Sequence, residues 1–488
     1  MARSWMKLDR WAVALGCVLA CGCGGAGGAN DAGASDAADA PGAPVADVTV
    51  AVDTTVTHQT MVGFGASLVY YADFVSGRQV ANDDIYDVLF NQLGLDVLRI
   101  GNWYQNQTET GTSTSTLFSD SAIPIIVQGA TAALGHPPRI VMSSWTPPAY
   151  LKSNADTKNG GTLARPGAAG TGYDYAGFAQ WWVSALSAYG AMGVAPDYVS
   201  IQNEPELMTN YESCLFDAAA GGANALYGSA VDAVYAAVTA SSLAKKPALV
   251  GPETIGLGPI AASGDTLDDS VGGLNASALG AIAHHLYSGG STSDDPDSYI
   301  PVMNVEASRL ATANRPLFMT EFAPPTPTLL ATAWLIHNAL TIEGVSVYLY
   351  WALAWAPGSP VNWLVTVENP QAAFTTPKGY TINDPYYALK HYAKWIDEGW
   401  VRVDATSLMS TVKASAFLSP AGTDLTVVLI NTDVAAHTVA VGAGSFPIAR
   451  AAAYRSSGTD ERAAPTEIAA GNVVTLPAGS ILTMTLGQ

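Results

Sequence analysis

The folded part of the chain repeats one pattern, in which a short apolar run ends in polar residues and a longer segment with helical spacing follows. Eight such runs occur, at 61–67, 97–101, 139–145, 198–204, 248–253, 281–287, 317–322 and 347–351. Between them lie segments such as 175–190, where Tyr175, Phe178, Trp182 and Tyr189 recur on one helical face. Continuous apolar strands that alternate with helices predict a parallel sheet, and eight such units predict a closed (β/α)8 barrel.

The pattern changes near residue 399 to short strands of alternating polar and apolar side chains, as at 412–419, 423–432 and 472–486. This alternation predicts an antiparallel β-sandwich over residues 399–488. The sandwich sequence is poor in the aromatic side chains that a sugar platform needs. We therefore expect it to pack against the barrel rather than to bind carbohydrate.

The predicted barrel domain spans residues 47–398, but its first residues do not follow the barrel pattern. Residues 48–56 alternate between polar and apolar side chains, as the C-terminal strands do. We therefore expect residues 47–60 to add a strand to the sandwich.

The first 23 residues have the pattern of a secretory signal, because a cationic start precedes an apolar run too short to span a bilayer. The run ends in LACGC, which resembles the cleavage box of bacterial lipoproteins, with Cys23 or Cys21 as the lipidated residue. Residues 24–46 are rich in glycine, alanine and aspartate, which is typical of a disordered linker. We expect a secreted or lipid-anchored bacterial surface protein, and a monomer.

Composition excludes some classes of partner. The formal net charge is −20, which repels nucleic acid and favours a neutral polymer such as a polysaccharide. Only Cys214 among the four cysteines lies outside the leader, so no internal disulfide supports the fold. We expect no cofactor.

Polar and aromatic side chains gather where the predicted strands end, and in a (β/α)8 barrel this edge carries the chemistry. The candidates are Arg99, Trp145, Asn203, Glu204, His285, Tyr287, Glu321 and Trp351. Ser67 and Glu253 also end strands, but their side chains give weaker signals.

Glu204 ends the fourth predicted strand and Glu321 ends the seventh, so we expect them to face each other across the barrel mouth. Two facing carboxyl groups are the machinery of glycoside hydrolysis, and retaining enzymes hold them about 5–5.5 Å apart. Arg99 and Tyr287 are expected to stabilise the anionic form of Glu321, which makes it the nucleophile. Glu204 is then the acid/base, protonated at rest because of the charge on Glu321.

The remaining candidates are expected to bind substrate. Asn203 is positioned to donate to a sugar 2-hydroxyl, and Trp145 and Trp351 offer flat faces to a sugar ring. The pair His284 and His285 does not indicate a metal site, because neighbouring residues of a strand point to opposite faces. We expect His285 to hydrogen-bond in the site and His284 to pack outside it, with no metal.

At this point the sequence resembles glycoside hydrolase family 30 over residues 47–488. The resemblance rests on these motifs, read together: GFGAS (63–67), LRIGNWYQN (98–106), SSWTPPAYLKSN (143–154), VSIQNEPE (199–206), HLY (285–287), MTEF (319–322), YYALKHYAKWI (386–396) and GWVRVDAT (399–406). It implies a barrel fused to a side sandwich built from both chain ends, with the acid/base and nucleophile after strands four and seven.

Within that family the sequence looks most like the bacterial xylanases. Those that require glucuronic acid on xylan carry an arginine just after the eighth strand, whereas residues 350–363 here contain no arginine or lysine. The resemblance therefore implies an endo-1,4-β-xylanase that does not depend on glucuronic acid.

Other activities remain open from the sequence. Within the family they are an exo-acting xylobiohydrolase or β-xylosidase, a β-1,6-glucanase and a glucosylceramidase-like β-glucosidase. A different class is a surface lipoprotein that only binds glycan, although binding alone does not need two carboxyl groups.

Overall fold

The computed structural model describes residues 45–78, 83–105, 122–167, 172–257, 278–288, 295–310, 315–458 and 461–488. The predicted signal, the lipidation site at Cys21 or Cys23 and most of the predicted linker lie outside these residues. No helix in the described ranges is long and apolar enough to cross a membrane.

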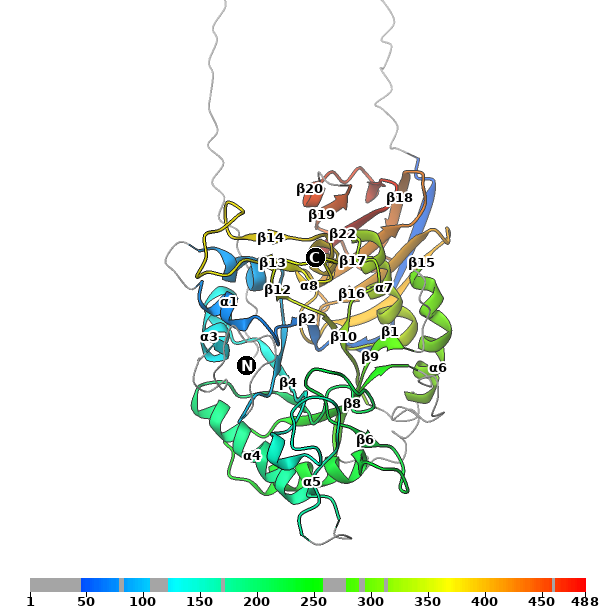
Figure 1. The fold of residues 1–488 in the computed structure, drawn as a ribbon. Coiled ribbons are helices and arrows are strands. Elements are labelled where there is room, and N and C mark those ends of the chain that lie inside the picture. Colours follow the sequence, from blue (N-terminus) through cyan, green and yellow to red (C-terminus); the bar gives the residue numbers. More distant parts are fainter. Residues whose placement is uncertain are drawn as a thin grey trace, which may run out of the picture. The chain divides into compact units, whose positions relative to one another are not determined.

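Eight parallel strands close into a barrel, which confirms the predicted fold class (Figure 1). The order around the barrel is β10-β11-β2-β3-β4-β5-β8-β9. The strands are β2 (Gly63–Ser67), β3 (Val97–Gly101), β4 (Arg139–Ser143), β5 (Tyr198–Ser200), β8 (Ala248–Gly256), β9 (Leu279–Ser288), β10 (Leu317–Phe322) and β11 (Val347–Tyr350).

The barrel interior is filled by small and β-branched side chains that point inward from the strands. They form one cluster with Phe318 and include Val97, Val141, Val250, Ala281, Ala283, Val347 and Leu349. At Gly65 the neighbouring strand comes so close that an added Cβ would lie 1.7 Å from the carbonyl oxygen of Val97. Only glycine fits there, which explains why the first barrel strand reads GFGAS.

Helices surround the barrel and connect its strands. They are α1 (Ala72–Ser76), α3 (Ala122–Leu134), α4 (Tyr175–Ala191), α5 (Tyr227–Ala240), α6 (Ile300–Leu310), α7 (Leu329–Asn338) and α8 (Asp384–Ala393). Short helical turns are η1 (Asp87–Gln92), η2 (Ala149–Leu151), η4 (Pro296–Tyr299) and η5 (Ala339–Glu343). Helix α4 matches the predicted 175–190 pattern and begins where the Asp174 side chain accepts from the Gly177 amide at 2.8 Å.

A second, mostly antiparallel sheet follows the barrel in the chain, in the order β20-β19-β22-β17-β16-β15-β1-β18-β21. The strands are β1 (Val48–Thr60), β15 (Val401–Ser407), β16 (Val412–Leu418), β17 (Asp424–Asn431), β18 (His437–Gly442), β19 (Arg450–Ser457), β20 (Glu461–Thr466), β21 (Val473–Leu476) and β22 (Ser480–Gly487).

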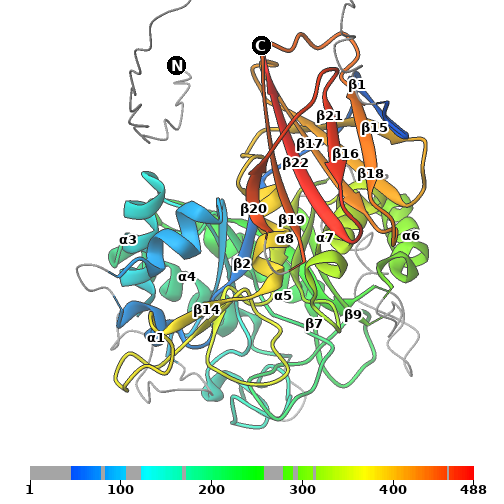
Figure 2. The same ribbon diagram turned by 90° about the horizontal axis from the view of Figure 1, so that it is seen from above.

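The N-terminal strand β1 lies inside this C-terminal sheet (Figures 1 and 2). It pairs antiparallel with β15, where Val50 faces Ser407, and parallel with β18, where Val48 faces Val439. Its alternating valines are buried in the core of the sheet. The two ends of the chain therefore build one domain.

Two small sheets lie in loops that follow barrel strands. One pairs β6 (Phe216–Asp217) with β7 (Ala225–Leu226) after β5. The other joins β12 (Ala354–Trp355), β13 (Val365–Val367) and β14 (Tyr380–Ile382) after β11. The sequence pattern predicts neither sheet, because their strands are only two or three residues long.

The barrel and the sheet share a polar contact through helix α8. The buried His391 lies 2.9 Å from the hydroxyl of Thr483 and 2.8 Å from that of Ser456. Trp395 stacks on Tyr454 with ring centroids 4.6 Å apart. These contacts fit the expectation that the sheet packs against the barrel.

Candidate active site

Arg99 forms the base of the site, because the β3 strand carries its buried guanidinium to the centre of the barrel mouth. Its Nη1 donates to Oε2 of Glu321 at 2.6 Å, and its Nη2 donates to Oδ1 of Asn203 at 2.7 Å. Its Nε and Nη2 each lie 3.2 Å from an oxygen of Glu253. Arginine only donates hydrogen bonds, so every one of these partners is held as an acceptor.

The two predicted carboxyl groups meet across the mouth. An oxygen of Glu204, an oxygen of Glu321 and a ring nitrogen of His285 all lie within 4.8 Å of one another. Both glutamates are buried. The Nδ1 atom of His285 lies 3.0 Å from Oε1 of Glu204, while the Nε2 atom of His284 lies 2.6 Å from Oε1 of Glu343 on the other face of β9.

Among the described residues, these three side chains form the one group whose ligand atoms are close enough together to hold a metal ion. Arg99, already 2.6 Å from Glu321, competes for that carboxylate. The expectation that the site needs no metal stays a prediction.

Glu204 differs from the prediction in its local structure. Strand β5 ends at Ser200, so Gln202, Asn203 and Glu204 lie in a turn beyond it rather than in the strand. Glu204 has a φ of 44° and Glu253 a φ of 55°, a left-handed conformation that side chains rarely adopt. The Glu204 amide donates to the carbonyl of Glu253 in β8 at 3.0 Å, which joins the two strained positions.

The buried environment separates the acid–base properties of the site. Burial raises the pKa of Glu204 to about 7, Arg99 opposes that rise and the charge of Glu253 adds to it. The sequence predicts that the charge of Glu321 raises this pKa, whereas in the structure burial and the charge of Glu253 raise it. Burial also raises the pKa of Glu321, while His285 and Arg99 hold it down. Burial lowers the pKa of His285 to about 4, so its ring is neutral at neutral pH.

A cavity of about 560 Å³ opens above these groups. Half of its lining residues are aromatic, and the lining includes Tyr70, Trp145, Asn203, Glu204, Tyr211, Tyr287, Glu321, Trp351, Trp355, Asn362 and Trp363. All eight predicted site residues therefore lie in or directly under one cavity, with Arg99 and His285 beneath it. Its only charged lining residues within the described chain are the two glutamates.

The three aromatic candidates, Trp145, Tyr287 and Trp351, all line this cavity. Trp145 and Trp351 both line the cavity, with ring centroids 6.1 Å apart. The guanidinium of Arg99 lies 4.7 Å from the ring centre of Trp145, so one face of that indole is already covered. Tyr287 is 40% exposed, and its hydroxyl hydrogen-bonds to Glu321.

The comparison with known families identifies the C-terminal sheet. Residues 399–484 match the family model described as the glycosyl hydrolase family 30 beta sandwich domain. Residues 399–484 are therefore a family 30 β-sandwich domain. This match agrees with the predicted resemblance to family 30 and supports the predicted class of glycoside hydrolases.

The fold of the described chain as a whole is similar to solved structures of glycoside hydrolases. One is the glycoside hydrolase family 30 subfamily 8 xylanase Xyn30A from Clostridium acetobutylicum, with a TM-score of 0.67 at 23% identity over 90% of this chain and 100% of that chain. A second is the family 30 xylanase C from Talaromyces cellulolyticus, with a TM-score of 0.69 at 21% identity over 90% and 100%. The endo-β1,6-glucanase BT3312 matches at 0.63 and 16% identity over 90% and 94%. At these identities the similarity establishes the fold.

Glu253 is the member of the site to which the sequence analysis gave too little weight. It is fully buried, and the Ser143 hydroxyl donates to its Oε1 at 3.1 Å. Although burial raises its pKa most, Arg99, His285 and hydrogen bonds from Ser200 and Thr320 together lower it. A single glutamate at a strand end is a weak signal for an active site. Only the closed barrel shows that Glu253 lies beside Arg99.

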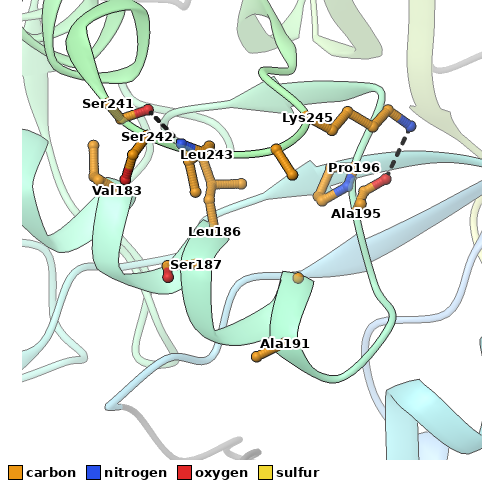
Figure 3. Close-up of a pocket in the computed structure, with 12 residues that line it drawn as sticks. Val183, Leu186, Ser187, Ala191, Ala195, Pro196, Ser241, Ser242, Leu243 and Lys245 are labelled. Atoms are coloured by element: carbon orange, nitrogen blue, oxygen red, sulfur yellow. Dashed lines mark hydrogen bonds between the residues drawn. The ribbon is translucent and has the colours of Figure 1, made fainter.

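Figure 3 shows a second hollow, of about 330 Å³. Because residues that precede β5 and β8 line it, it lies at the end of the barrel opposite to the mouth. It is lined by the C-terminal half of α4 and by the residues that precede β5 and β8. Lys245 is its only titratable lining residue in the described chain, and its Nζ donates to the carbonyl of Ala195 at 3.0 Å. This hollow offers no acid–base pair.

Proposed function

We propose that this family 30 enzyme is a retaining endo-1,4-β-xylanase that does not require glucuronic acid side chains. The observation that carries the proposal is the approach of one oxygen each from Glu204 and Glu321 to within 4.8 Å under an aromatic cavity. Retaining enzymes hold their carboxyl groups about 5–5.5 Å apart, whereas inverting enzymes leave about 6.5–9.5 Å for a water molecule.

Glu321 is the nucleophile in this proposal. The 2.6 Å ion pair with Arg99 and the hydrogen bond from Tyr287 favour its anionic form against the cost of burial. These donors hold the carboxylate so that a free oxygen can attack the anomeric carbon.

Glu204 is the acid/base. Its pKa of about 7 keeps it largely protonated at slightly acid pH. In the first step it gives its proton to the leaving oxygen while Glu321 forms a bond to the anomeric carbon. In the second step Glu204 takes a proton from water, whose oxygen displaces Glu321 from that carbon.

Asn203 is proposed to bind the sugar 2-hydroxyl. Its Oδ1 accepts from Arg99, so the amide nitrogen is the atom left to donate. Its side chain also hydrogen-bonds to Glu204, which holds it beside the proposed acid/base. A contact to the 2-hydroxyl that tightens as positive charge develops on the ring stabilises the transition state.

A neutral substrate is supported by the charges around the cavity. Two glutamates line it, and no arginine or lysine is among its described lining residues. The xylanase neighbours favour xylan, whereas the β-1,6-glucanase neighbour keeps a glucan as the second candidate. Both are uncharged polymers.

The test is hydrolysis of plain arabinoxylan, glucuronoxylan and a β-1,6-glucan by the full chain, with products followed over time. We expect mixed xylo-oligosaccharides early on both xylans, with the β-anomer formed first in proton NMR. Cleavage only beside uronate-bearing residues, or only of the glucan, contradicts the substrate proposal. The α-anomer appearing first contradicts the retaining mechanism.

A further inference from the structure

A buried pair of titratable side chains lies behind the site, on the face of β9 that points away from the cavity. Nε2 of His284 lies 2.6 Å from Oε1 of Glu343, and both side chains are fully buried. Glu343 is the last residue of η5, a π-helical turn. Such turns are rare and are frequent at functional sites. The proposed reaction gives this pair no role.

The contacts of the His284 ring determine where its protons lie. Its Nδ1 lies 2.7 Å from the carbonyl oxygen of His285. A carbonyl only accepts hydrogen bonds, so Nδ1 carries a hydrogen and donates it. Nε2 faces the carboxyl oxygen of Glu343 at 2.6 Å, and two lone pairs do not approach so closely without a proton between them. The ring is therefore held on both sides, by Glu343 and by the backbone of its own strand.

The ring of His284 holds β9 where the pairing of this strand is irregular. On the β10 side the register passes over Thr320, and on the β8 side it passes over Glu253. Irregular pairing of this kind disrupts the ladder locally and redirects side chains, often next to active sites. The side chain that this part of the backbone carries into the site is His285. The bond from His284 therefore supports the strand where the ladder supports it least.

His285 connects this backbone to the proposed acid. Its Nδ1 lies 3.0 Å from Oε1 of Glu204, and its side chain is fully buried. Its pKa is lowered to about 4, chiefly by burial, and the charge of His284 contributes to this fall. A proton donor must lie within hydrogen-bond distance of the atom that it protonates. A displaced His285 ring would therefore weaken the hold on Glu204 and make proton donation slower.

We propose that Glu343 is a positioning residue for the proposed acid Glu204, acting through the ring of His284 and the carbonyl of His285. This inference rests on the proposed function, because it takes Glu204 as the acid. Neither member of the pair lines the cavity, so neither is placed to contact the substrate. Loss of the pair should therefore affect proton donation in the first step and leave attack by the nucleophile almost unchanged.

The first test compares two aryl β-xylobiosides whose leaving groups differ in their need for a proton. Phenol leaves with help from an acid, whereas 2,4-dinitrophenol leaves as a stable anion. The test variant combines His284→Val with Glu343→Leu, because apolar replacement of a whole buried ion pair is often neutral for stability. We expect its kcat/KM to fall about tenfold on the phenyl substrate and by less than about twofold on the dinitrophenyl substrate.

Two further variants serve as controls for this ratio of kcat/KM values. In Glu343→Gln the amide can donate to Nε2 of His284 in place of the shared proton, so the ratio is expected to stay as in the wild type. His391→Leu removes a buried histidine that contacts Thr483 of the sheet, and it is expected to lower stability with an unchanged ratio. An unchanged ratio in the double variant, or the same change in His391→Leu, overturns the proposal.

A second test needs no turnover, so it separates failure of this inference from failure of the xylanase proposal. Two-bond ¹H–¹⁵N NMR spectra follow the rings of the seven histidines, and His285→Asn identifies the signals of His285. Near neutral pH we expect a single tautomer of His285 in the wild type and a mixture of both tautomers in the double variant. If the wild type cleaves neither xylobioside, the xylanase proposal fails, yet this change of tautomer still supports the positioning role. The same single tautomer in both proteins overturns it.

Discussion

The Nδ1 atom of His285 lies 3.0 Å from Oε1 of Glu204, so a neutral imidazole touches the proposed acid. The pKa of Glu204 is raised by burial to about 7, and that of His285 is lowered by burial to about 4. The proton of the site therefore resides on the carboxyl group rather than on the imidazole near neutral pH. In water an imidazole has a higher pKa than a carboxyl group, so this site reverses the usual order of the two pKa values.

The first prediction concerns the dependence of kcat/KM on pH. Glu204 must be protonated for the first step, so activity is present below its pKa and is lost as pH rises through about 7. A pH profile of kcat/KM on xylan checks this. A basic limb well above pH 8 shows that another group is the acid.

The second prediction concerns Glu321. Glu321→Gln keeps the shape of the side chain but cannot form the covalent intermediate, so we expect kcat to fall by at least about 10⁴-fold. Calorimetry of the same variant with a xylo-oligosaccharide is expected to show retained binding. Turnover within tenfold of the wild type contradicts the nucleophile assignment.

The third prediction concerns Glu253, which we regard as a positioning residue for Arg99. In Glu253→Gln one charged partner of Arg99 is lost, and so is a charge that raises the pKa of Glu204. We expect kcat to fall by about 10- to 100-fold, with the basic limb of the pH profile moving to lower pH.

The matched control for Glu253 is Ser143→Ala, which removes a neutral partner of both Arg99 and Glu253. It is expected to lower kcat without moving the limb. A purely structural role for Glu253 predicts lower thermal stability with an unshifted profile.

The fourth prediction concerns the support of the β12–β14 sheet. The buried Arg78 donates to the carbonyl of Gly379 at 3.1 Å and lies 4.7 Å from the ring centre of Phe374. Arg78→Ala leaves buried acceptors unpaired, so we expect a loss of about 1–3 kcal/mol in the free energy of unfolding and a raised KM. Lys378→Ala, at an exposed side chain of the same loop, is the control and is expected to change neither measurably.

The fifth prediction concerns the start of β1. His437 lies 3.0 Å from Asp47 and 3.2 Å from Asp433, and these partners raise its pKa, mainly through Asp47. A raised histidine pKa stabilises the fold below the unfolded pKa of about 6.5, and this contribution is lost as pH rises through the folded pKa.

We therefore expect His437→Ala to lower the melting temperature more at pH 6 than at pH 9. His391→Ala serves as the comparison. Burial lowers the pKa of His391 to about 3, so we expect no such difference between pH 6 and pH 9 for this variant. An effect of His437→Ala that is equal at both pH values shows that the contact is not electrostatic.

Much of this architecture follows from the sequence. All eight barrel strands lie where apolar runs predict them, because a strand buried on both faces must be continuously apolar. Once the strands are placed, the rule that strand ends meet at one edge brings Arg99, Glu204 and Glu321 together. The alternation in β1 is likewise strong, because every second side chain is buried at its start.

Other features of the site cannot be predicted from the periodicity of apolar residues in the sequence. The sequence predicts strand at Glu204 because apolar residues precede it. In the structure Glu204 has a φ of 44°, and its amide donates to Glu253 of β8, a contact far away in the sequence. Trp355 and Trp363 lie in strands and turns too short to leave a pattern. Glu253 is buried because the barrel closes around it. No local stretch of the sequence predicts this burial.

The position of β1 has a consequence for biosynthesis. Its partners β15 and β18 follow the barrel in the chain, so β1 has no strand to pair with until residues 401–442 have been made. A truncated product that ends after the barrel would leave that strand without a sheet and prone to aggregate. The second domain can thus close only after β15 and β18 have been synthesised.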